Sequence, residues 1–255
     1  MPKATVLLKT TGSYARDAFI QGLARLGYEI TDLPSRAPSP EDVVVIWNRL
    51  PREANAVRPY DQVGARVLVT ENGYVGPRDG SKRFALALGD HNGAGAWPVG
   101  GPERFEALEV DLQPWRERGD QVVVLPQRGI GRPTVAMPST WTQRVWRELP
   151  KLTKRPITLR RHPGPDKTEP YDALRGAHAA VTWGSGAAIK ALAVGVPVFF
   201  EFPRWIGAPA ACLGLADIEE PWLGDRLPMF QRLAWAQWSR AEIESGEAFD
   251  WLLRS

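Results

Sequence analysis

The feature that most constrains the fold is a series of short apolar runs separated by stretches with helical periodicity. Val43–Trp47, Gln121–Leu125 and Ala177–Trp183 are such runs. Continuous apolar character is typical of strands buried on both faces of a parallel sheet. The alternation of these runs with helical stretches therefore predicts successive βα units. Weaker or shorter strands are expected at Thr5–Lys9, Arg66–Thr70, Phe84–Leu88, Ile157–Arg161 and Pro197–Phe200.

A glycine- and proline-rich stretch followed by a polar one, at residues 100–119, divides the pattern into two sets. A chain of 255 residues is long for one ordinary domain and sufficient for two small ones. We expect an α/β protein with two Rossmann-like domains that face each other across a cleft. Residues 1–115 would form the first domain, and residues 116–255 would form the second and end in a helix. Ligands of open α/β sheets bind beyond the carboxyl ends of the strands, where every distinctive motif of this chain lies.

The composition excludes several classes of protein. No apolar run approaches the ~20 residues of a membrane-spanning helix, so we expect no membrane insertion. The N-terminus becomes polar too early for a signal peptide, and a single cysteine excludes a disulfide framework. We therefore expect a cytoplasmic protein, which would mean the host cytoplasm if a phage encodes it.

Positive charge is concentrated in the middle of the chain. Residues 116–167 contain 12 Lys and Arg against 4 Asp and Glu, a net charge of +8, whereas the whole chain has a net charge of +3. A basic segment of this kind favours an anionic ligand such as a nucleotide, a phosphate or nucleic acid. A solvated basic helix is an equally reasonable interpretation.

The second half contains two turns that can bind phosphate. Gly184, Ser185 and Gly186 follow an expected strand and precede an expected helix, where free N–H groups favour an anion. His162 follows another strand and is fixed by Pro163, and an imidazole there can donate to a phosphate oxygen. We expect these turns to lie on neighbouring strands. Glycines packing a tight turn and a structural histidine are the alternatives.

Two arginines are further candidates for this phosphate site. Arg128 lies in a turn after another expected strand, and Arg161 precedes the candidate histidine. His178 lies inside an apolar strand and is expected to be a core residue.

The first half supplies candidate acids. Glu71 lies at the end of an apolar run before Asn72-Gly73, and Asp90 and His91 follow the next run. A transfer to a hydroxyl needs a carboxylate or imidazole as general base, so these three are the catalytic candidates. Asp17, Asn72 and Trp97 are expected to contact the acceptor. The histidines show no metal-ligand spacing and no Asp-x-Asp triplet occurs, so we expect no metal site.

Residues 120–210 resemble the capsular-polysaccharide-synthesis glycosyltransferases, which include Kdo transferases and polysialyltransferases. The motifs that carry the resemblance are Arg160–Pro163, Val181–Gly186 and Ala191–Val198. The resemblance implies a GT-B fold in which His162 and Ser185 contact the donor's phosphate. It also implies that Glu71 is the base, although Asn72 replaces the second acid of that family's motif.

The resemblance implies a metal-independent glycosyltransferase with a nucleotide sugar as co-substrate and no other cofactor. Short enzymes of this kind also resemble phage proteins that glycosylate hydroxymethylated pyrimidines such as 5-hydroxymethylcytosine. The basic segment suits double-stranded DNA as the acceptor, and we expect this acceptor first. A capsule- or lipopolysaccharide-type glycan, a non-catalytic nucleotide- or DNA-binding module, and an epimerase or hydrolase of the nucleotide sugar are the alternatives.

Overall fold

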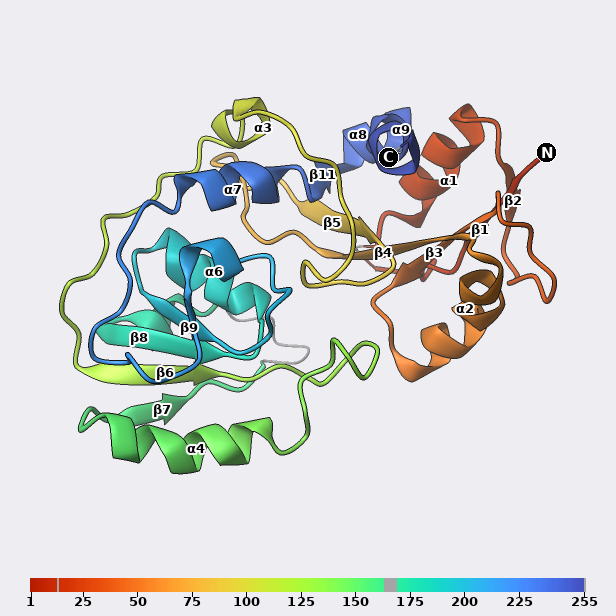
Figure 1. Cartoon of the computed structure of the whole chain (residues 1–255). Coiled ribbons are helices and arrows are strands. Elements are labelled where there is room, and N and C mark those ends of the chain that lie inside the picture. The colour runs from red at the N-terminus through yellow and green to blue at the C-terminus, as the bar shows by residue number, and fades with distance from the viewer. Residues whose placement is uncertain (13, 163–168, 255) are drawn as a thin grey trace. The chain divides into compact units, whose positions relative to one another are not determined.

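The computed structural model describes residues 1–12, 14–162 and 169–254, and it divides into two compact α/β units (Figure 1). Unit 1 comprises Met1–Leu108 and Arg232–Ser255, and unit 2 comprises Glu109–Gln231. The sequence prediction of mixed α/β structure with parallel sheets is confirmed. The division differs from the expected one, because the chain returns to unit 1 after residue 231 instead of ending in the second domain.

The described residues of unit 1 form a six-stranded sheet of order β11-β5-β4-β3-β1-β2. Its elements are β1 (Lys3–Val6), α1 (Arg16–Arg25), β2 (Glu29–Thr31), β3 (Val43–Trp47), α2 (Pro51–Val63), β4 (Arg66–Asn72), β5 (Arg83–Leu88), α3 (Glu103–Glu106), α7 (Leu227–Ala234, whose first five residues belong to unit 2), β11 (Gln237–Ser239), α8 (Arg240–Ser245) and α9 (Glu247–Arg254).

Each face of this sheet has its own apolar core. One core contains Leu68, Phe84, Trp238 and residues of α1, α8 and α9. The other contains Val67, Val69 and Tyr60 of α2. Because alternate residues of a strand point to opposite faces, Glu71 continues the Val67–Val69 series on the α2 face. Asn72, which pairs with Phe84, lies on the α1 face.

One strand of unit 1, β5, runs against the parallel direction expected for this half, so both of its pairings are antiparallel. β5 is antiparallel to β4, and β11 is antiparallel to β5. A hairpin-like return needs no crossover helix, and residues 73–82 connect β4 to β5 directly. β11 explains why the C-terminal segment belongs to unit 1, because it extends this sheet and leads into α8, which packs on α1.

The described residues of unit 2 form a five-stranded parallel sheet of order β10-β9-β8-β6-β7. Its elements are β6 (Gln121–Leu125), α4 (Trp141–Leu152), β7 (Ile157–Leu159), α5 (Tyr171–Leu174), β8 (Ala177–Thr182), α6 (Gly186–Ala193), β9 (Val198–Phe200), the 3-10 helix η2 (Ala208–Ala210) and β10 (Cys212–Leu213).

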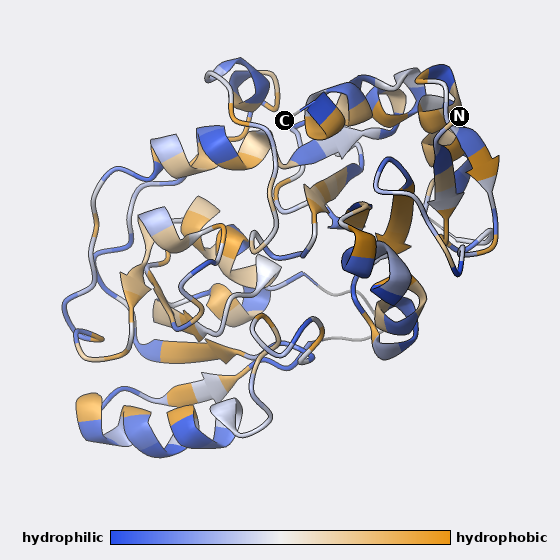
Figure 2. Cartoon of the chain, turned by 45° about the vertical axis from the view of Figure 1, so that its right-hand side comes forward, coloured by the Kyte–Doolittle hydropathy of each residue, from blue (hydrophilic) through white to orange (hydrophobic). Residues whose placement is uncertain are grey.

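Apolar strands and one-sided helices build the core of unit 2. β6 and β8 are buried along nearly their whole length, and α4 packs Trp141, Val145 and Leu149 against them. Figure 2 shows the strands as hydrophobic and α4 as alternating between hydrophobic and hydrophilic residues, as an amphipathic helix requires. His178 is buried and its Nε2 lies 2.9 Å from the Ile218 carbonyl, which confirms it as a core residue.

Candidate functional site

Three loops of unit 2 lie side by side at the carboxyl edge of its sheet. They follow β8, β6 and β7, which are adjacent in that order, so β6 separates the strands that precede Ser185 and His162. The two turns were expected on neighbouring strands, and that expectation is wrong because β7 pairs with β6 alone among the described strands. The chain reverses its direction across the sheet between β6 and β8, and such switch points are the usual ligand crevice of an α/β sheet.

Ser185 is the N-cap of α6. Its Oγ accepts a hydrogen bond from the Ala187 N–H (3.2 Å), and its own N–H donates to Thr182 Oγ1 (3.0 Å). The hydroxyl proton of Ser185 and the N–H of Gly186 have no acceptor among the described residues. Together with the partial positive charge of the helix end, these groups form a site that favours an anion.

Gly184 has a steric role in this turn. A Cβ at this position would lie 3.2 Å from both Phe202 and Trp205, so a larger residue would require these side chains to shift by a few tenths of an ångström. The Gly184 carbonyl accepts a hydrogen bond from Gln127 Nε2 (2.9 Å), which joins the loops that follow β6 and β8. Sequence reasoning missed Gln127, although its place directly after a strand was visible.

His162 lies in a positively charged environment. Partial desolvation, followed by the charges of Arg128 and Arg160, lowers the pKa of its imidazole below the usual 6.5. The structure thus brings Arg128 near His162, as the sequence analysis expected of a shared anion site, and it adds Arg160. Arg161 is exposed beside them. Pro163, which was expected to fix the histidine, lies outside the described residues.

A carboxylate that the sequence analysis missed also lies at this edge. Glu201 directly follows β9 and accepts hydrogen bonds from Trp141 Nε1 and Arg144. Trp205, which lies shortly after Glu201 in the chain, is only 2% exposed and is a core residue.

Glu71 lies at the carboxyl end of β4 in unit 1, and its carboxylate is held at one oxygen. Oε1 accepts hydrogen bonds from the Tyr74 hydroxyl (2.7 Å) and from the Asn92 N–H (2.8 Å). Oε2 receives no hydrogen bond from the described residues. A carboxylate fixed through one oxygen, with the other available, has the geometry that a general base requires.

Buried residues hold the Tyr74 side of this arrangement. The Gln237 side chain accepts from the N–H groups of Tyr74 (2.9 Å) and Val75 (3.3 Å) and donates to the Val75 carbonyl (2.8 Å). Burial, followed by the adjacent Glu71 carboxylate, raises the pKa of Tyr74 well above its ordinary value, so its hydroxyl remains a donor. Sequence reasoning missed both residues: Gln237 lies 163 positions from Tyr74, whereas Tyr74 lies only three positions after Glu71 and was within reach of a local reading.

Asp90 and His91 follow β5, as expected, but that strand runs antiparallel to β4. Because β5 is antiparallel, its carboxyl end lies beside the start of β4, at the opposite edge from Glu71. Both residues are buried, and Arg49 Nε lies 3.7 Å from Asp90 Oδ1. The loop that contains them brings the Asn92 N–H to Glu71. This loop therefore helps to hold the Glu71 carboxylate in place through a backbone hydrogen bond.

The three expected acceptor contacts do not gather at one place. Asp17 begins α1 and Asn72 ends β4 on the α1 face, and both lie toward the carboxyl edge. Trp97 follows the Leu88–Ala96 bridge at the other end of β5, where the Arg232 guanidinium lies 5.2 Å from its ring centre. The structure therefore separates Trp97 from the other two.

Two further findings concern the described residues only. They contain no group of three or more His, Cys, Asp or Glu side chains with the arrangement of a metal site. Among the helices that the structure describes, none has the length and apolar character to cross a bilayer.

Comparison with solved structures shows that two other proteins share this fold. Both are solved structures of KpsC from Thermosulfurimonas dismutans. One is titled a beta Kdo 2,7 transferase, with a TM-score of 0.57, 13% identity and complete coverage of both chains. The other is titled a beta Kdo 2,4 transferase, with a TM-score of 0.56, 15% identity and coverage of 93% of this chain and 91% of that one. No family model and no curated protein matches the sequence.

Proposed function

We propose that the protein is a glycosyltransferase that moves a sugar from a nucleotide sugar to an acceptor hydroxyl. The observation that carries the proposal is the loop set at the carboxyl edge of unit 2, in a chain that shares the fold of two Kdo transferases over 100% and 91% of their lengths. This edge combines the Gly186 N–H at the start of α6, the Ser185 hydroxyl and a cluster of cations around His162. These are groups suited to a nucleotide phosphate.

In this proposal, unit 2 stabilises the leaving group. As the bond between the anomeric carbon and the donor phosphate breaks, negative charge grows on the phosphate oxygens. The Ser185 hydroxyl, the Gly186 N–H and His162 would donate to those oxygens, with Arg128 and Arg161 adding positive charge. Preorganised donors of this kind typically contribute ~3 kcal/mol each to the lowering of the barrier.

Unit 1 would supply the base. The acceptor hydroxyl would give its proton to Glu71 Oε2 while its oxygen bonds to the anomeric carbon. The two hydrogen bonds at Oε1 support this role, because they fix the carboxylate without occupying Oε2. The mechanism requires that the carboxyl edges of the two sheets face one another during the reaction, and no metal or further cofactor takes part in it.

For the acceptor, we propose a hydroxyl of a glycan, in agreement with the printed activities of the two structural relatives. A hydroxymethylated pyrimidine in double-stranded DNA is the second candidate, favoured by the net charge of +8 in residues 116–167. Part of that charge is paired within unit 2, since Arg144 contacts Glu148 and Glu201, and Arg155 contacts Glu219. This pairing favours the glycan.

A transfer assay tests the proposal. The purified chain would be incubated with a panel of nucleotide sugars and with oligosaccharides, plain DNA or hydroxymethylated DNA, and the products identified by mass spectrometry. We expect a sugar-sized mass increase on an oligosaccharide, and its loss in Glu71→Gln with the fold intact. Donor turnover that needs no acceptor would identify a hydrolase or epimerase instead. If no combination of donor and acceptor gives transfer or donor hydrolysis, the protein is a binding module and not an enzyme.

A further inference from the structure

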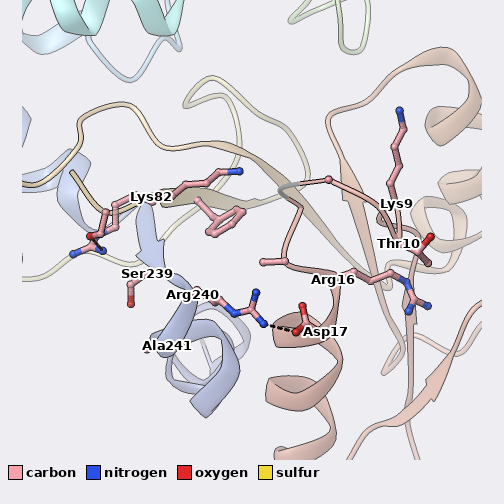
Figure 3. A pocket seen from close by; sticks show the side chains of 13 residues that line it. Lys9, Thr10, Arg16, Asp17, Lys82, Ser239, Arg240 and Ala241 are labelled. Atoms are coloured by element: carbon pink, nitrogen blue, oxygen red, sulfur yellow. Dashed lines mark hydrogen bonds and ion pairs between the residues drawn. The ribbon is translucent and has the colours of Figure 1, made fainter. Parts of the chain in front are cut away.

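The two units differ in how charges on their surfaces are paired. In unit 1, three segments far apart in the sequence line a cavity of about 650 Å³: the chain after β1 with the start of α1, the start of β5, and the junction of β11 and α8 (Figure 3). Two arginines of this lining pair with carboxylates of the same unit, Arg240 with Asp17 and Arg16 with Asp32. In unit 2, by contrast, two surface segments of opposite charge expose side chains that form no ion pair with a described residue.

The first segment is the basic helix face, which we define as residues 144–155, the C-terminal part of α4 and the three residues after it. It contains five Lys and Arg against one Glu. Two of the arginines pair with carboxylates of unit 2. The other three cations are exposed and form no ion pair within the part of the chain that the structure describes: Arg147, Lys151 and Lys154.

The second segment is the acidic segment, which we define as residues 212–225 and which begins with β10. It contains four Asp and Glu and no Lys or Arg. Glu219 pairs with Arg155 of the basic helix face. The other three acids are exposed, and among the described residues they have no cationic partner: Asp217, Glu220 and Asp225.

The two segments lie side by side on one face of unit 2. Ile218 of the acidic segment packs into the same core as the apolar residues of α4. Arg155 pairs with Glu219 at 3.0 Å, and the Thr153 hydroxyl also donates to Glu219. Residues 151–155 and Glu219 line a hollow of about 510 Å³ at this junction. Positive and negative surfaces therefore adjoin each other here.

Exposed apolar side chains gather in the same two segments. Unit 2 has seven large apolar side chains that are exposed among its described residues, and five of them belong to these segments. Contiguous exposed apolar surface next to polar residues is typical of an interaction site. The five, with their exposed fractions, are Trp146 (45%), Leu152 (39%), Leu213 (67%), Trp222 (43%) and Leu223 (39%).

Trp222 is exposed but is held in one orientation. Its ring centre lies 6.2 Å from that of Trp115, whose Nε1 donates to the Gly224 carbonyl (2.8 Å). A Cβ at Gly224 would lie 2.2 Å from Trp222 Cζ2, so any larger residue would displace the indole. The Trp222 N–H also donates to Cys212 Sγ (3.2 Å). An aromatic side chain that is already ordered loses little entropy on binding, which is characteristic of an interface anchor.

We propose that this face joins two copies of the chain across a two-fold axis, with the basic helix face of each copy against the acidic segment of the other. A two-fold axis places every contact twice, so a face that carries both charges side by side is complementary to itself. The apolar side chains would supply most of the affinity, and the charges would fix the orientation. An anionic bilayer or a duplex fits less well, because the acidic segment adjoins the cations and would be repelled.

This interface does not depend on the transferase function and leaves its donor loops accessible. α4 leads into the start of β7, so the C-terminal end of α4 lies toward the amino edge of the sheet. Ser185 and His162 follow β8 and β7 at the opposite, carboxyl edge. Dimerisation can therefore be measured without donor or acceptor, and its failure is distinguishable from failure of sugar transfer.

Sedimentation equilibrium of the full chain at low salt tests the proposal. We expect a reversible dimer with a Kd of about 100 μM or tighter, and no larger species, because a two-fold contact closes on itself. Trp222→Gln should weaken dimerisation by about tenfold or more, as expected for an interface anchor. A chain that stays monomeric, that grows beyond the dimer, or that dimerises unchanged in Trp222→Gln would overturn the proposal.

Charge reversal distinguishes this interface from any other dimer contact. Lys151→Glu and Glu220→Lys should each weaken dimerisation by about tenfold or more, because like charges then face each other twice. Lys151→Glu/Glu220→Lys reverses both signs and should restore the wild-type Kd. Arg58→Glu, on the exposed surface of α2 in unit 1, is the matched control and should dimerise like the wild type. Circular dichroism would verify that each variant is folded.

Three results of this comparison would refute the interface. They are single reversals that dimerise like the wild type, a double variant that does not recover, and an equal loss in the Arg58 control. Binding to phosphatidylglycerol vesicles or duplex DNA that depends on Lys151 and dissociates the dimer would assign the basic helix face to an anionic surface instead.

Discussion

Arg49 offers a quantitative test of how unit 1 supports its candidate base. Its guanidinium is 3% exposed, donates to both oxygens of Asp61 (2.9 and 3.0 Å) and to the Gly89 carbonyl (2.5 Å), and lies 3.7 Å from Asp90. Asp61 is 35% exposed and Asp90 only 8%. Water can therefore solvate Asp61 when Arg49 is removed, whereas Asp90 stays buried and loses this counter-charge.

We expect Arg49→Met to destabilise the protein by about 3–5 kcal/mol, the usual cost when one partner of a buried ion pair is removed. Met retains much of the volume, so most of this cost comes from charge. Adding Asp90→Asn should recover about 1–3 kcal/mol, because the buried negative charge is then absent. The positions are in contact, so their effects should not add.

Urea unfolding followed by far-ultraviolet circular dichroism measures these differences, with Arg58→Met as the control. An exposed substitution of this kind should change stability by no more than about 0.5 kcal/mol. A loss below about 1 kcal/mol in Arg49→Met, or no recovery in the double variant, would refute the inference that Arg49 stabilises the buried Asp90 carboxylate as its counter-charge. The double variant should also transfer sugar more slowly than the wild type, because the loop that supplies the Asn92 N–H to Glu71 is no longer tied to Arg49.

Four other outcomes are expected. Tyr74→Phe should lower kcat by about tenfold or more with little change in KM, because a hydrogen bond to a charged group is worth about 1.5–3 kcal/mol; unchanged kcat contradicts the positioning role. Ser185→Ala should weaken nucleotide binding in calorimetry and cost about 1 kcal/mol of stability through the lost cap, whereas wild-type affinity would dismiss the phosphate contact. The lowered pKa leaves His162 neutral at pH 7, and a bound diphosphate favours its protonation, so nucleotide affinity should rise as pH falls from 8 toward 6; a pH dependence that persists in His162→Gln would contradict this. EDTA should leave transfer unchanged, and its restoration only by an added divalent cation would contradict metal independence.

The apolar runs were sufficient to predict much of the strand content. Val43–Trp47 and Gln121–Leu125 are strands with the expected boundaries. The expected strand at Thr5–Lys9 is instead Lys3–Val6. Local apolar character marks a buried strand but does not mark where its pairing ends, which depends on the neighbouring strands.

The direction and partners of the strands required the tertiary structure. Phe84–Leu88 has the composition of a strand whichever way it runs, and its antiparallel pairing puts its carboxyl end beside the start of β4, from which the loop with Asp90 and His91 returns toward Glu71. The short strand Gln237–Ser239 was not among the strands expected from the sequence. It forms because β5 offers an open edge for pairing.

The sequence by itself determined which residue types lie at the strand ends, because glycine turns and helix starts are local features of the chain. It therefore identified Glu71, Ser185 and His162 as candidates. Only the tertiary structure decided what surrounds them. The support of Glu71 by Tyr74 and Gln237, and the cavity built from three distant segments, depend on contacts between residues up to 223 positions apart. Such contacts form when strands pair and helices pack, and a local pattern does not specify them.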